Sequence, residues 1–447
     1  MIKSLLIANR GEIAVRIIKT CRNMGIKTVQ VFSDADKNSL AVALADESVN
    51  IGPAPAAQSY LKKELIIEKA LEAKVDAIHP GYGFLSENAT FSESVSKKGL
   101  IFIGPTSDVI ASLGDKIQAR LIAKASGIEA VPGYEIGDLA DLKVDDLRSR
   151  LGFPLMIKAA AGGGGRGIRI VHSESDLLSS LETASAEAKA SFGDGTIYLE
   201  RYIENARHIE VQFIGDGENF LHLFERECSI QRRRQKIWEE APASCLTKKE
   251  RQDVCDMAIK LAAHVKYKGV GTVEFLYDTD RREFYFIEVN TRIQVEHPTT
   301  EFITGFDIVE LMIKVAGGKK LDFKQESVKF RGHAIECRIN AEDPENNFFP
   351  SPGVVKKITV PSANEIRFDT FLTDGAEVPP FYDSMVGKLI VFGATRQEAL
   401  SRLVGALDKL HITNIATTLP LHQKLAKNID VINNDVNINF LEKKFLK

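Results

Sequence analysis

Residues 4–32 have the sequence SLLIANRGEIAVRIIKTCRNMGIKTVQVF, and the alternation within this stretch decides the fold class. Residues 4–8 are apolar and predict a buried strand, while residues 12–24 repeat apolar side chains at helical spacing. Gly25 is placed to stop that helix, and residues 28–32 predict the next strand. Alternating strands and helices of this length predict a parallel sheet with helices on both faces.

The pattern changes after the first hundred residues. Strand and helix signals alternate up to residue 103, which predicts a Rossmann-like N-terminal domain. Paired strands then become more common, with a hairpin predicted around Asp216-Gly217, a favoured turn dipeptide. Helices are predicted over residues 176–191, where Ser173 and Asp176 have the spacing of a capping box, and over residues 248–266. The chain therefore combines an α/β opening with an α+β remainder, and we predict domains at residues 1–110, 111–203 and 204–447.

Composition limits the class of protein. The 447 residues exceed the roughly 250–300 at which single cores stop growing, so several packed units are expected. The net charge of −3 gives no general basic field for nucleic acid or anionic membrane. Five scattered cysteines without a C-x-x-C pair fit a reducing compartment, and no apolar run approaches the roughly 20 residues of a membrane span. We expect a cytoplasmic protein that binds neither nucleic acid nor membrane.

A glycine-rich loop lies at residues 162–167, GGGGRG. It satisfies G-x-G-x-x-G, but a dinucleotide fingerprint needs a strand before it and a helix after it, whereas this loop separates two strand-like segments. Bare backbone amides in such a hairpin tip can surround phosphate oxygens, and Lys158 and Arg166 add positive charge. A flexible connector without a ligand is the alternative.

Residues 288–296, EVNTRIQVE, are more informative. In an extended chain alternate side chains share a face, so one face would carry Glu288, Asn290, Arg292, Gln294 and Glu296. Glu274, on the predicted partner strand, would add a carboxylate, and these hard oxygen ligands suit Mg²⁺ beside phosphates. The alternative is an amphipathic strand with its polar face in water. Asparagine is depleted in strands, which favours a site.

Three other segments are ambiguous when taken alone. Residues 225–236 mix charges at the end of a predicted strand, and a solvated strand end is the simpler interpretation. Residues 79–84 could be only a tight turn, and Arg338 is one arginine in a strand-like segment.

Taken together, these segments resemble the biotin carboxylase family, the ATP-grasp half of biotin-dependent carboxylases. The matching stretches run nearly end to end: IANRGEIAVRII at 7–18, HPGYGFLSEN at 79–88, FIGP at 102–105, GDK at 114–116, IKAAAGGGGRG at 157–167, RHIEVQ at 207–212, ECSIQRR at 227–233, EEAPA at 239–243, FIEVNTRIQVEHP at 286–298, RGHAIECRINAEDP at 331–344, PSPG at 350–353 and YDSMVGKL at 382–389. The resemblance implies an ATP-grasp fold with a glycine-rich lid and a C-terminal mixed domain.

The resemblance also implies a role for each matching residue. ATP would be bound by Lys116, Lys158, Gly164 and Gly165, by a hinge of Glu200, Arg201, Tyr202 and Ile203, and by His208, Gln231, Leu276 and Ile438. Magnesium (or manganese) would be held by Glu274, Glu288 and Asn290. Bicarbonate would be bound by Lys236, Arg292, Gln294 and the Val295 backbone, with Glu296 as its general base. Arg338 would face the ureido oxygen of biotin, and Tyr82 would lie near that ring.

Two positions depart from the family pattern. The family usually has His-Gln-Lys where this chain has Arg234-Gln235-Lys236, and that histidine contacts the nucleotide. Trp238 stands where a small aliphatic residue is usual.

The resemblance implies an assembly as well. No methionine precedes a lysine, so the biotin carboxyl carrier protein and the carboxyltransferase are expected as separate chains, and family members of this length are typically homodimers. Biotin would be a carrier-bound substrate. The acyl acceptor stays open among acetyl-CoA, propionyl-CoA and pyruvate; the first would place the chain in fatty acid biosynthesis.

Two other functions compete with this one. The first is another ATP-grasp ligase that activates a different carboxylate, from which residues 79–84 and Arg338 would distinguish the chain. The second is a non-catalytic paralogue that binds nucleotide or carrier. Intact Glu288, Arg292 and Glu296 argue against the paralogue, and only Arg234 supports it.

Overall fold

The structure, a computed structural model, describes residues 2–136, 151–159, 169–192 and 195–446, which form two compact units. The larger unit comprises Met1–Gly127, Arg207–Phe275 and Ile287–Lys447, and the smaller comprises Ile128–Ala206 and Leu276–Phe286. The predicted three-part division at residues 110 and 203 stays a prediction.

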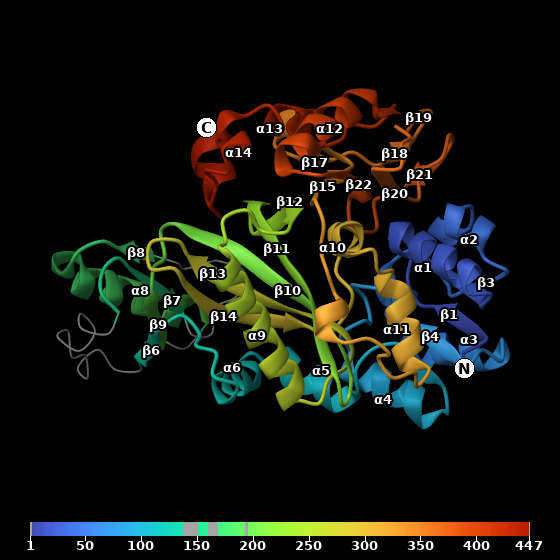
Figure 1. The fold of residues 1–447 in the computed structure, drawn as a ribbon, viewed down its shortest axis with the longest axis horizontal. Coiled ribbons are helices and arrows are strands. Elements are labelled where there is room, and N and C mark those ends of the chain that lie inside the picture. Colours follow the sequence, from blue (N-terminus) through green and yellow to red (C-terminus); the bar gives the residue numbers. More distant parts are fainter. Residues whose placement is uncertain (1, 137–150, 160–168, 193–194, 447) are drawn as a thin grey trace. The chain divides into compact units, whose positions relative to one another are not determined.

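A five-stranded parallel sheet opens the larger unit, with strand order β3-β2-β1-β4-β5 (Figure 1). Its strands are β1 (Ser4–Ile7), β2 (Lys27–Phe32), β3 (Glu47–Asn50), β4 (Ala77–His79) and β5 (Ile101–Phe102). Apolar residues of β1 are fully buried, as expected when helices cover a parallel sheet. The predicted Rossmann-like opening is confirmed.

Helices connect these strands and follow the last of them. They are α1 (Gly11–Asn23), α2 (Leu40–Leu44), α3 (Lys63–Glu72), α4 (Ala89–Lys97), α5 (Ser107–Gly114) and α6 (Lys116–Ala125), of which α5 and α6 follow the last strand. Gly25 follows α1 with φ +67°, the left-handed conformation that ends helices at glycine. The helix that the sequence predicts over residues 12–24 is therefore confirmed within one residue at each end.

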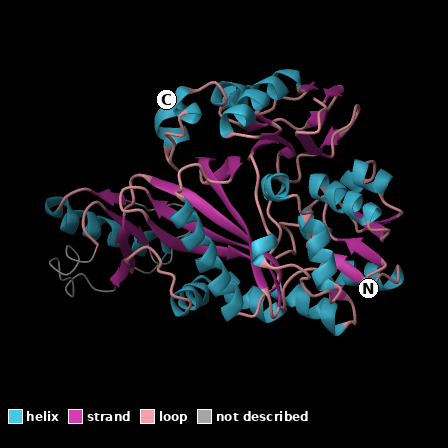
Figure 2. Cartoon of the chain, in the orientation of Figure 1, coloured by secondary structure: helices cyan, strands magenta, loops and turns pink. Residues whose placement is uncertain are grey.

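An eight-stranded sheet carries most of the remaining larger unit (Figure 2, magenta strands). In spatial order its strands are β14 (Glu283–Asn290), β13 (Lys268–Asp278), β10 (Ala206–Asp216), β11 (Phe220–Arg232), β12 (Gln235–Ala241), β15 (His333–Asn340), β22 (Met385–Gly393) and β20 (Ile366–Thr370). The hairpin around Asp216-Gly217 is confirmed. The solvated end predicted for residues 225–236 is wrong up to Gln231, where β11 is mostly buried and pairs with β12, and right for residues 233–235, which are exposed.

Helices and short strands complete this unit. The helices are α9 (Lys248–His264), α10 (His297–Thr304), α11 (Ile308–Ala316), α12 (Arg396–Lys409), α13 (Leu419–Leu425) and α14 (Ile429–Ile432). Three small ladders pair β16 (Glu342–Asp343) with β17 (Phe349–Pro350), β18 (Gly353–Val354) with β21 (Glu377–Val378), and β19 (Lys357–Thr359) with β23 (His411–Thr413). Among the described residues, no helix has both the length and the apolar character needed to cross a bilayer.

The smaller unit contains a four-stranded antiparallel sheet of order β6-β9-β7-β8. Its elements are β6 (Gly133–Ile136), β7 (Leu155–Ala159), β8 (Arg169–Val171), β9 (Ile197–Arg201) and α8 (Leu177–Phe192), which shares a hydrophobic core with the sheet. β7 and β8 pair antiparallel on either side of the glycine-rich loop, so a dinucleotide fingerprint is excluded; the loop itself lies outside the described residues. Ser173 makes no capping hydrogen bond to the backbone, and the predicted capping box is wrong.

Candidate active site

A cavity of about 320 Å³ lies in the larger unit, lined mainly by polar side chains. Its walls come from β10, β12, β13, β14, β15 and the segment between β14 and α10. Many predicted site residues line it: His208, Arg234, Lys236, Glu274, Glu288, Asn290, Arg292, Gln294, Val295, Glu296 and Arg338. Residues that are up to 130 positions apart in the sequence thus meet in one pocket.

Lys236, on β12, is the central cation of this cavity. Its Nζ donates to three carboxylates: Glu210 Oε2 at 2.5 Å, Glu274 Oε1 at 2.7 Å and Glu296 Oε1 at 2.8 Å. Burial alone would lower the pKa of Lys236, but the three carboxylates outweigh it and hold that pKa well above its ordinary value. Lys236 is therefore a permanent positive charge in a pocket that excludes much of the water.

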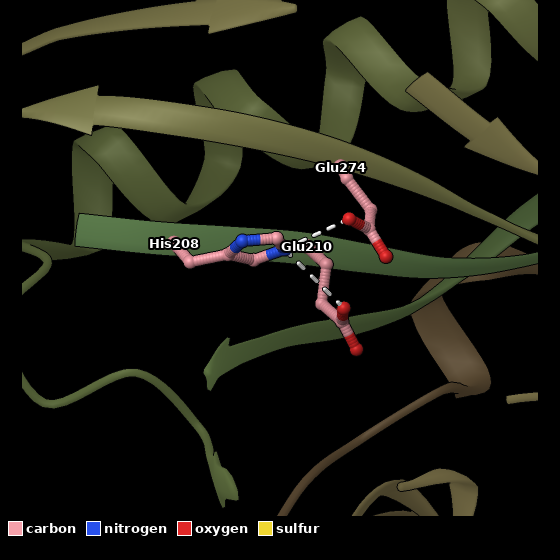
Figure 3. Close-up of side chains that lie close together, drawn as sticks. All are labelled: His208, Glu210 and Glu274. Atoms are coloured by element: carbon pink, nitrogen blue, oxygen red, sulfur yellow. Dashed lines mark ion pairs between the residues drawn. The ribbon is translucent and has the colours of Figure 1, made fainter. Parts of the chain in front are cut away.

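Glu274, on β13, is held by several donors. His208 Nε2 lies 3.0 Å from Glu274 Oε2 (Figure 3). The side-chain amides of Asn290 and Gln294 donate to Glu274 Oε1 at 2.8 and 2.7 Å. Burial raises the pKa of Glu274, but Lys236 and then His208 lower it more, so the carboxylate stays ionised. The neighbouring histidine and carboxylate come from alternate positions of β10, His208 and Glu210.

Glu274 and Glu288 together suit a divalent cation. Both line the cavity, and no hydrogen bond from another described residue reaches the Glu288 carboxylate. Loss of hydration and then repulsion from Glu274 raise the pKa of Glu288, and a bound cation would remove that repulsion. Together with the side-chain amide oxygen of Asn290, these two carboxylates offer only hard oxygen ligands, as Mg²⁺ prefers. The residues present therefore fit the predicted metal.

A second ligand set overlaps the first at one residue. His208, Glu210 and Glu274 place ligand atoms within 4.8 Å of one another (Figure 3). Its imidazole suits softer transition metals better than magnesium. Lys236 donates to Glu210 and to Glu274 alike, so the imidazole, and not the ion pairing, distinguishes this set from the magnesium set.

The segment after β14 departs from the predicted strand. β14 ends at Asn290, and residues 291–296 form an irregular turn that leads into α10. Strict alternation is therefore wrong at Val295, which alternation would direct away from the polar face but which lines the cavity. Arg292 fixes the turn, because its Nε contacts Glu87 Oε2 at 2.9 Å and its Nη2 contacts Asn290 Oδ1 at 2.9 Å.

Glu296 is held between two cations. Arg338 Nη2 donates to Glu296 Oε2 at 2.9 Å, and Lys236 approaches the other oxygen. Burial raises the pKa of Glu296, but Lys236 and Arg338 lower it well below its ordinary value. Arg338 Nε also donates to Glu239 Oε1 at 2.6 Å. An ionised, oriented carboxylate at this place can accept a proton from a bound anion.

A β-bulge brings Lys236 and Glu239 into the same site. Ile230 of β11 pairs with Trp238 of β12, but the next residue, Gln231, pairs with Lys236, so β12 has one extra residue between the two pairs. The extra residue, Ile237, interrupts the alternation of faces, so side chains three positions apart both reach the site. Trp238 is buried elsewhere in the core and does not line the cavity.

A second cavity, of about 410 Å³, shares part of its wall with the first. Arg292, Val295 and Arg338 line both, whereas Tyr82 and Phe84 line only the second. The Tyr82 hydroxyl donates to Glu12 Oε1. Arg338 therefore lies in the wall between one cavity lined mainly by charged and polar side chains and another with aromatic side chains in its walls.

The predicted ATP-binding residues divide between the two units. In the larger unit, Gln231 donates to Cys228 O at 2.8 Å and lies 3.1 Å from His208 Nδ1. Lys116 begins α6, and Ile438 is half-buried near the C-terminus. The smaller unit holds Lys158, Glu200, Arg201, Tyr202, Ile203 and Leu276, and there Lys158 forms an ion pair with Glu200. Gly164 and Gly165 lie outside the described residues.

Several site residues had not been predicted. Arg226, Glu210, Glu239 and Glu87 contact the residues described above. The sequence did contain a signal for Glu210, because the polar residues His208, Glu210 and Gln212 alternate on β10 as the polar residues of 288–296 were predicted to do.

The comparisons with known proteins agree with this geometry. Three family models match: "Biotin carboxylase, N-terminal domain" at residues 1–110, "Carbamoyl-phosphate synthase L chain, ATP binding domain" at 115–324 and "Biotin carboxylase C-terminal domain" at 336–443. The biotin carboxylase of Pseudomonas aeruginosa is 50% identical over 99% of both chains.

Solved structures match over the whole chain as well. The complex of Campylobacter jejuni biotin carboxylase with β,γ-ATP is 46% identical, with a TM-score of 0.88 and 99% of each chain covered. The biotin carboxylase domain dimer of Hydrogenobacter thermophilus 2-oxoglutarate carboxylase, in complex with MgADP, ADP and bicarbonate, is 42% identical, with a TM-score of 0.87 and coverage of 99% and 98%. The chain belongs to the biotin carboxylase family and is a ligase that couples ATP cleavage to the carboxylation of biotin.

Proposed function

We propose that this chain uses Mg²⁺-ATP and bicarbonate to carboxylate biotin on a carrier protein, with Glu296 as the base and Arg338 as the group that faces biotin. The observation that carries the proposal is the position of Glu296, an ionised carboxylate between Lys236 and Arg338, close to the wall shared by two cavities.

The first step would take place in the cavity that contains Lys236. Bicarbonate is a weak nucleophile, so it must be held in line with the γ-phosphorus while a base removes its proton. Lys236, Arg292 and Gln294 line this cavity and supply the donors. Glu296 would accept the proton of bicarbonate while a bicarbonate oxygen attacks the γ-phosphorus. The bond from that phosphorus to ADP would break, giving carboxyphosphate and ADP. Glu274, Glu288 and Asn290 would hold Mg²⁺, which neutralises phosphate charge during the transfer.

The second step would involve the aromatic cavity. Carboxyphosphate would split into CO₂ and phosphate close to the biotin nitrogen, and the released phosphate would take the proton from that nitrogen. Arg338 would stabilise the enolate oxygen of biotin as a preorganised donor while the nitrogen attacks CO₂. Arg338 suits this role because Glu239 and Glu296 fix its guanidinium from two sides. Tyr82 lines the same cavity and would contact the biotin ring.

The binding of ATP belongs to the same proposal. Lys116, Lys158 and the glycine-rich loop with Gly164 and Gly165 would contact the phosphates. Residues 200–203, His208, Gln231, Arg234, Leu276 and Ile438 would surround the nucleoside. The C. jejuni relative bound to β,γ-ATP supports this part of the proposal.

The proposal extends to the assembly. We propose a homodimer that works in the cytoplasm with a separate biotin carboxyl carrier protein and a separate carboxyltransferase. Full-length similarity to chains named biotin carboxylase, and the dimer named for the H. thermophilus relative, support it. With acetyl-CoA as the final acceptor, the assembly would serve fatty acid biosynthesis.

The first test measures ATP hydrolysis by the purified chain. Hydrolysis should require both Mg²⁺ and bicarbonate, and free biotin should raise it. Equal hydrolysis with and without bicarbonate would contradict the proposal and favour an ATP-grasp ligase that acts on another carboxylate.

The second test separates the two steps by measuring ADP and carboxybiotin in parallel. Loss of one oxyanion donor typically costs on the order of 10²–10³ in rate, so Arg338→Ala should lose carboxybiotin by about that factor and keep much of its bicarbonate-dependent ATP cleavage. Glu296→Ala should lose both products together.

Arg251→Ala is the matched control for Arg338→Ala. Its Nε lies 2.6 Å from Glu225, the same distance as Arg338 from Glu239, but Arg251 lines neither cavity. Equal loss of both products in Arg338→Ala would show that Arg338 also holds bicarbonate, and the division of roles would be wrong.

A further inference from the structure

Lys388, on β22, is a fully buried lysine close to both cavities, although it lines neither. Its Nζ donates to the carbonyl oxygen of Val295 and lies 3.2 Å from Glu12 Oε1. Lysine is almost never fully buried unless it is paired. The Val295 carbonyl belongs to the peptide that leads into Glu296, so Lys388 fixes the end of the turn that carries the anion-binding side chains.

Glu12, on α1, extends this contact to the second cavity. Its side chain is only 1% exposed, and Oε1 accepts from the Tyr82 hydroxyl as well as facing Lys388. Among the described residues, Glu12 Oε2 has no hydrogen-bond partner. A continuous series of contacts thus runs from Tyr82 through Glu12 and Lys388 to Val295. Tyr82 and Glu12 line only the second cavity, whereas Val295 lines both.

The pairing of the strands indicates that burying Lys388 here costs free energy. Lys388 is directly opposite Arg338 on β15 and directly opposite Asp369 on β20. Directly opposite residues share a face, so two cations are neighbours inside the protein, and nearby carboxylates must offset their repulsion. A well-packed apolar side chain of similar length would avoid this desolvation penalty. Filling space alone does not account for a lysine here.

We propose that Lys388 and Glu12 are positioning residues that couple the anion cavity to the aromatic cavity: Lys388 orients the Val295–Glu296 peptide, and Glu12 orients the Tyr82 hydroxyl. Lys388 lines neither cavity and would not touch a substrate, whereas Glu12 lines the aromatic cavity and would act through the Tyr82 hydroxyl. This inference rests on the proposed function, because it assigns bicarbonate to one end of the series and biotin to the other.

The main test is the KM of Lys388→Met, a neutral variant of similar length. A lost hydrogen bond to a charged group typically corresponds to about tenfold or more in an equilibrium constant. The KM for bicarbonate and the KM for biotin should each rise by about tenfold, while the KM for ATP stays within about twofold. A purely structural lysine would lower the urea midpoint of unfolding and leave all three KM values within about twofold of wild type, and that result would overturn the inference.

Arg251→Met is the control, since it breaks a buried ion pair with Glu225 away from both cavities. It should lower the urea midpoint and leave the KM values unchanged. Matching KM increases in Arg251→Met and Lys388→Met would show that the effect comes from general destabilisation, and the inference would fail.

A second measurement applies even if Lys388→Met does not fold. Tyr82→Phe and Glu12→Gln should each raise the KM for biotin more than the KM for bicarbonate. Because Glu12 would act through Tyr82, the double variant should have a biotin KM close to that of the more affected single variant. If the biotin KM of the double variant instead rose by the two single fold-changes multiplied together, the two residues would act independently and the inference would be overturned. A wild type without bicarbonate-dependent ATP cleavage would instead overturn the proposed function, and the inference with it.

Discussion

Replacing Arg226 tests whether the buried network beneath the anion cavity is maintained by charge. Arg226 is 0% exposed and makes five side-chain hydrogen bonds. Their acceptors are Glu210 Oε1 at 2.6 Å, Gln212 Oε1 at 2.9 Å, Thr300 Oγ1 at 2.9 Å, Thr272 Oγ1 at 3.4 Å and Gln294 Oε1 at 2.7 Å. Arg226→Met keeps most of the volume and removes every donor.

Breaking a buried ion pair by removing one partner usually costs about 3–5 kcal/mol. Glu210 keeps one cation, because Lys236 Nζ lies 2.5 Å from its other oxygen. We therefore expect a loss near the lower limit, about 3 kcal/mol in the free energy of unfolding. The double variant Arg226→Met/Glu210→Gln should lose less than Arg226→Met alone, because it also removes the buried carboxylate that has lost one of its two cations. The KM for bicarbonate should also rise, since Gln294 loses its donor.

Urea unfolding can be followed through Trp238, the only tryptophan, which is 2% exposed on the strand next to that of Arg226. Its fluorescence reports the opening of the sheet that contains the network. A loss below about 1 kcal/mol in Arg226→Met, or a double variant less stable than the single variant, would refute the reasoning.

Three further predictions concern charge. Arg234→His should change the apparent affinity for ATP with little change in turnover, because a guanidinium is longer than an imidazole and always charged; a change in bicarbonate affinity instead would contradict its predicted nucleotide contact. Glu288→Gln should raise the Mg²⁺ concentration needed for half-maximal ATP cleavage, and an unchanged magnesium titration would exclude it as a ligand. Burial lowers the pKa of His79 to about 3 and those of His222 and His422 to about 4. As pH falls below 6.5, these histidines therefore take up protons in the unfolded chain before they do so in the folded protein. Each histidine should then reduce the free energy of unfolding by up to about 1.4 kcal/mol per pH unit between about pH 6 and 4. Equal urea midpoints at pH 7 and 5 would contradict this.

The N-terminal sheet could be predicted because its signals are local. Each strand and helix within residues 4–32 carries its own apolar period and stop signal, and the structure reproduces both. The polar side chains at residues 288–296 were also identified by alternation, although the strand ends at Asn290. There the outcome was right for a partly wrong reason, because the irregular turn still directs Arg292, Gln294 and Glu296 into the cavity.

The buried polar residues could not be predicted because their partners are distant in sequence. Residues 225–236 are rich in charge, which normally indicates a solvated surface. Their burial depends on partners such as Gln294, which is 68 positions from Arg226. Similarly, Glu239 pairs with Arg338, 99 positions away, because β12 and β15 are neighbouring strands of the sheet. No short window of sequence contains that information.

The smaller unit is assembled from two stretches, Ile128–Ala206 and Leu276–Phe286, with residues 207–275 of the larger unit between them. A single excision therefore cannot remove it, and a single insertion cannot transplant it into another protein. Its second stretch joins β13 to β14, so it is completed only after the polypeptide has passed through β10, β11 and β12. During synthesis the smaller unit can therefore be completed only after much of the larger unit has been made. A single recombination event cannot separate the coding sequences of the two units, although each unit is compact once folded.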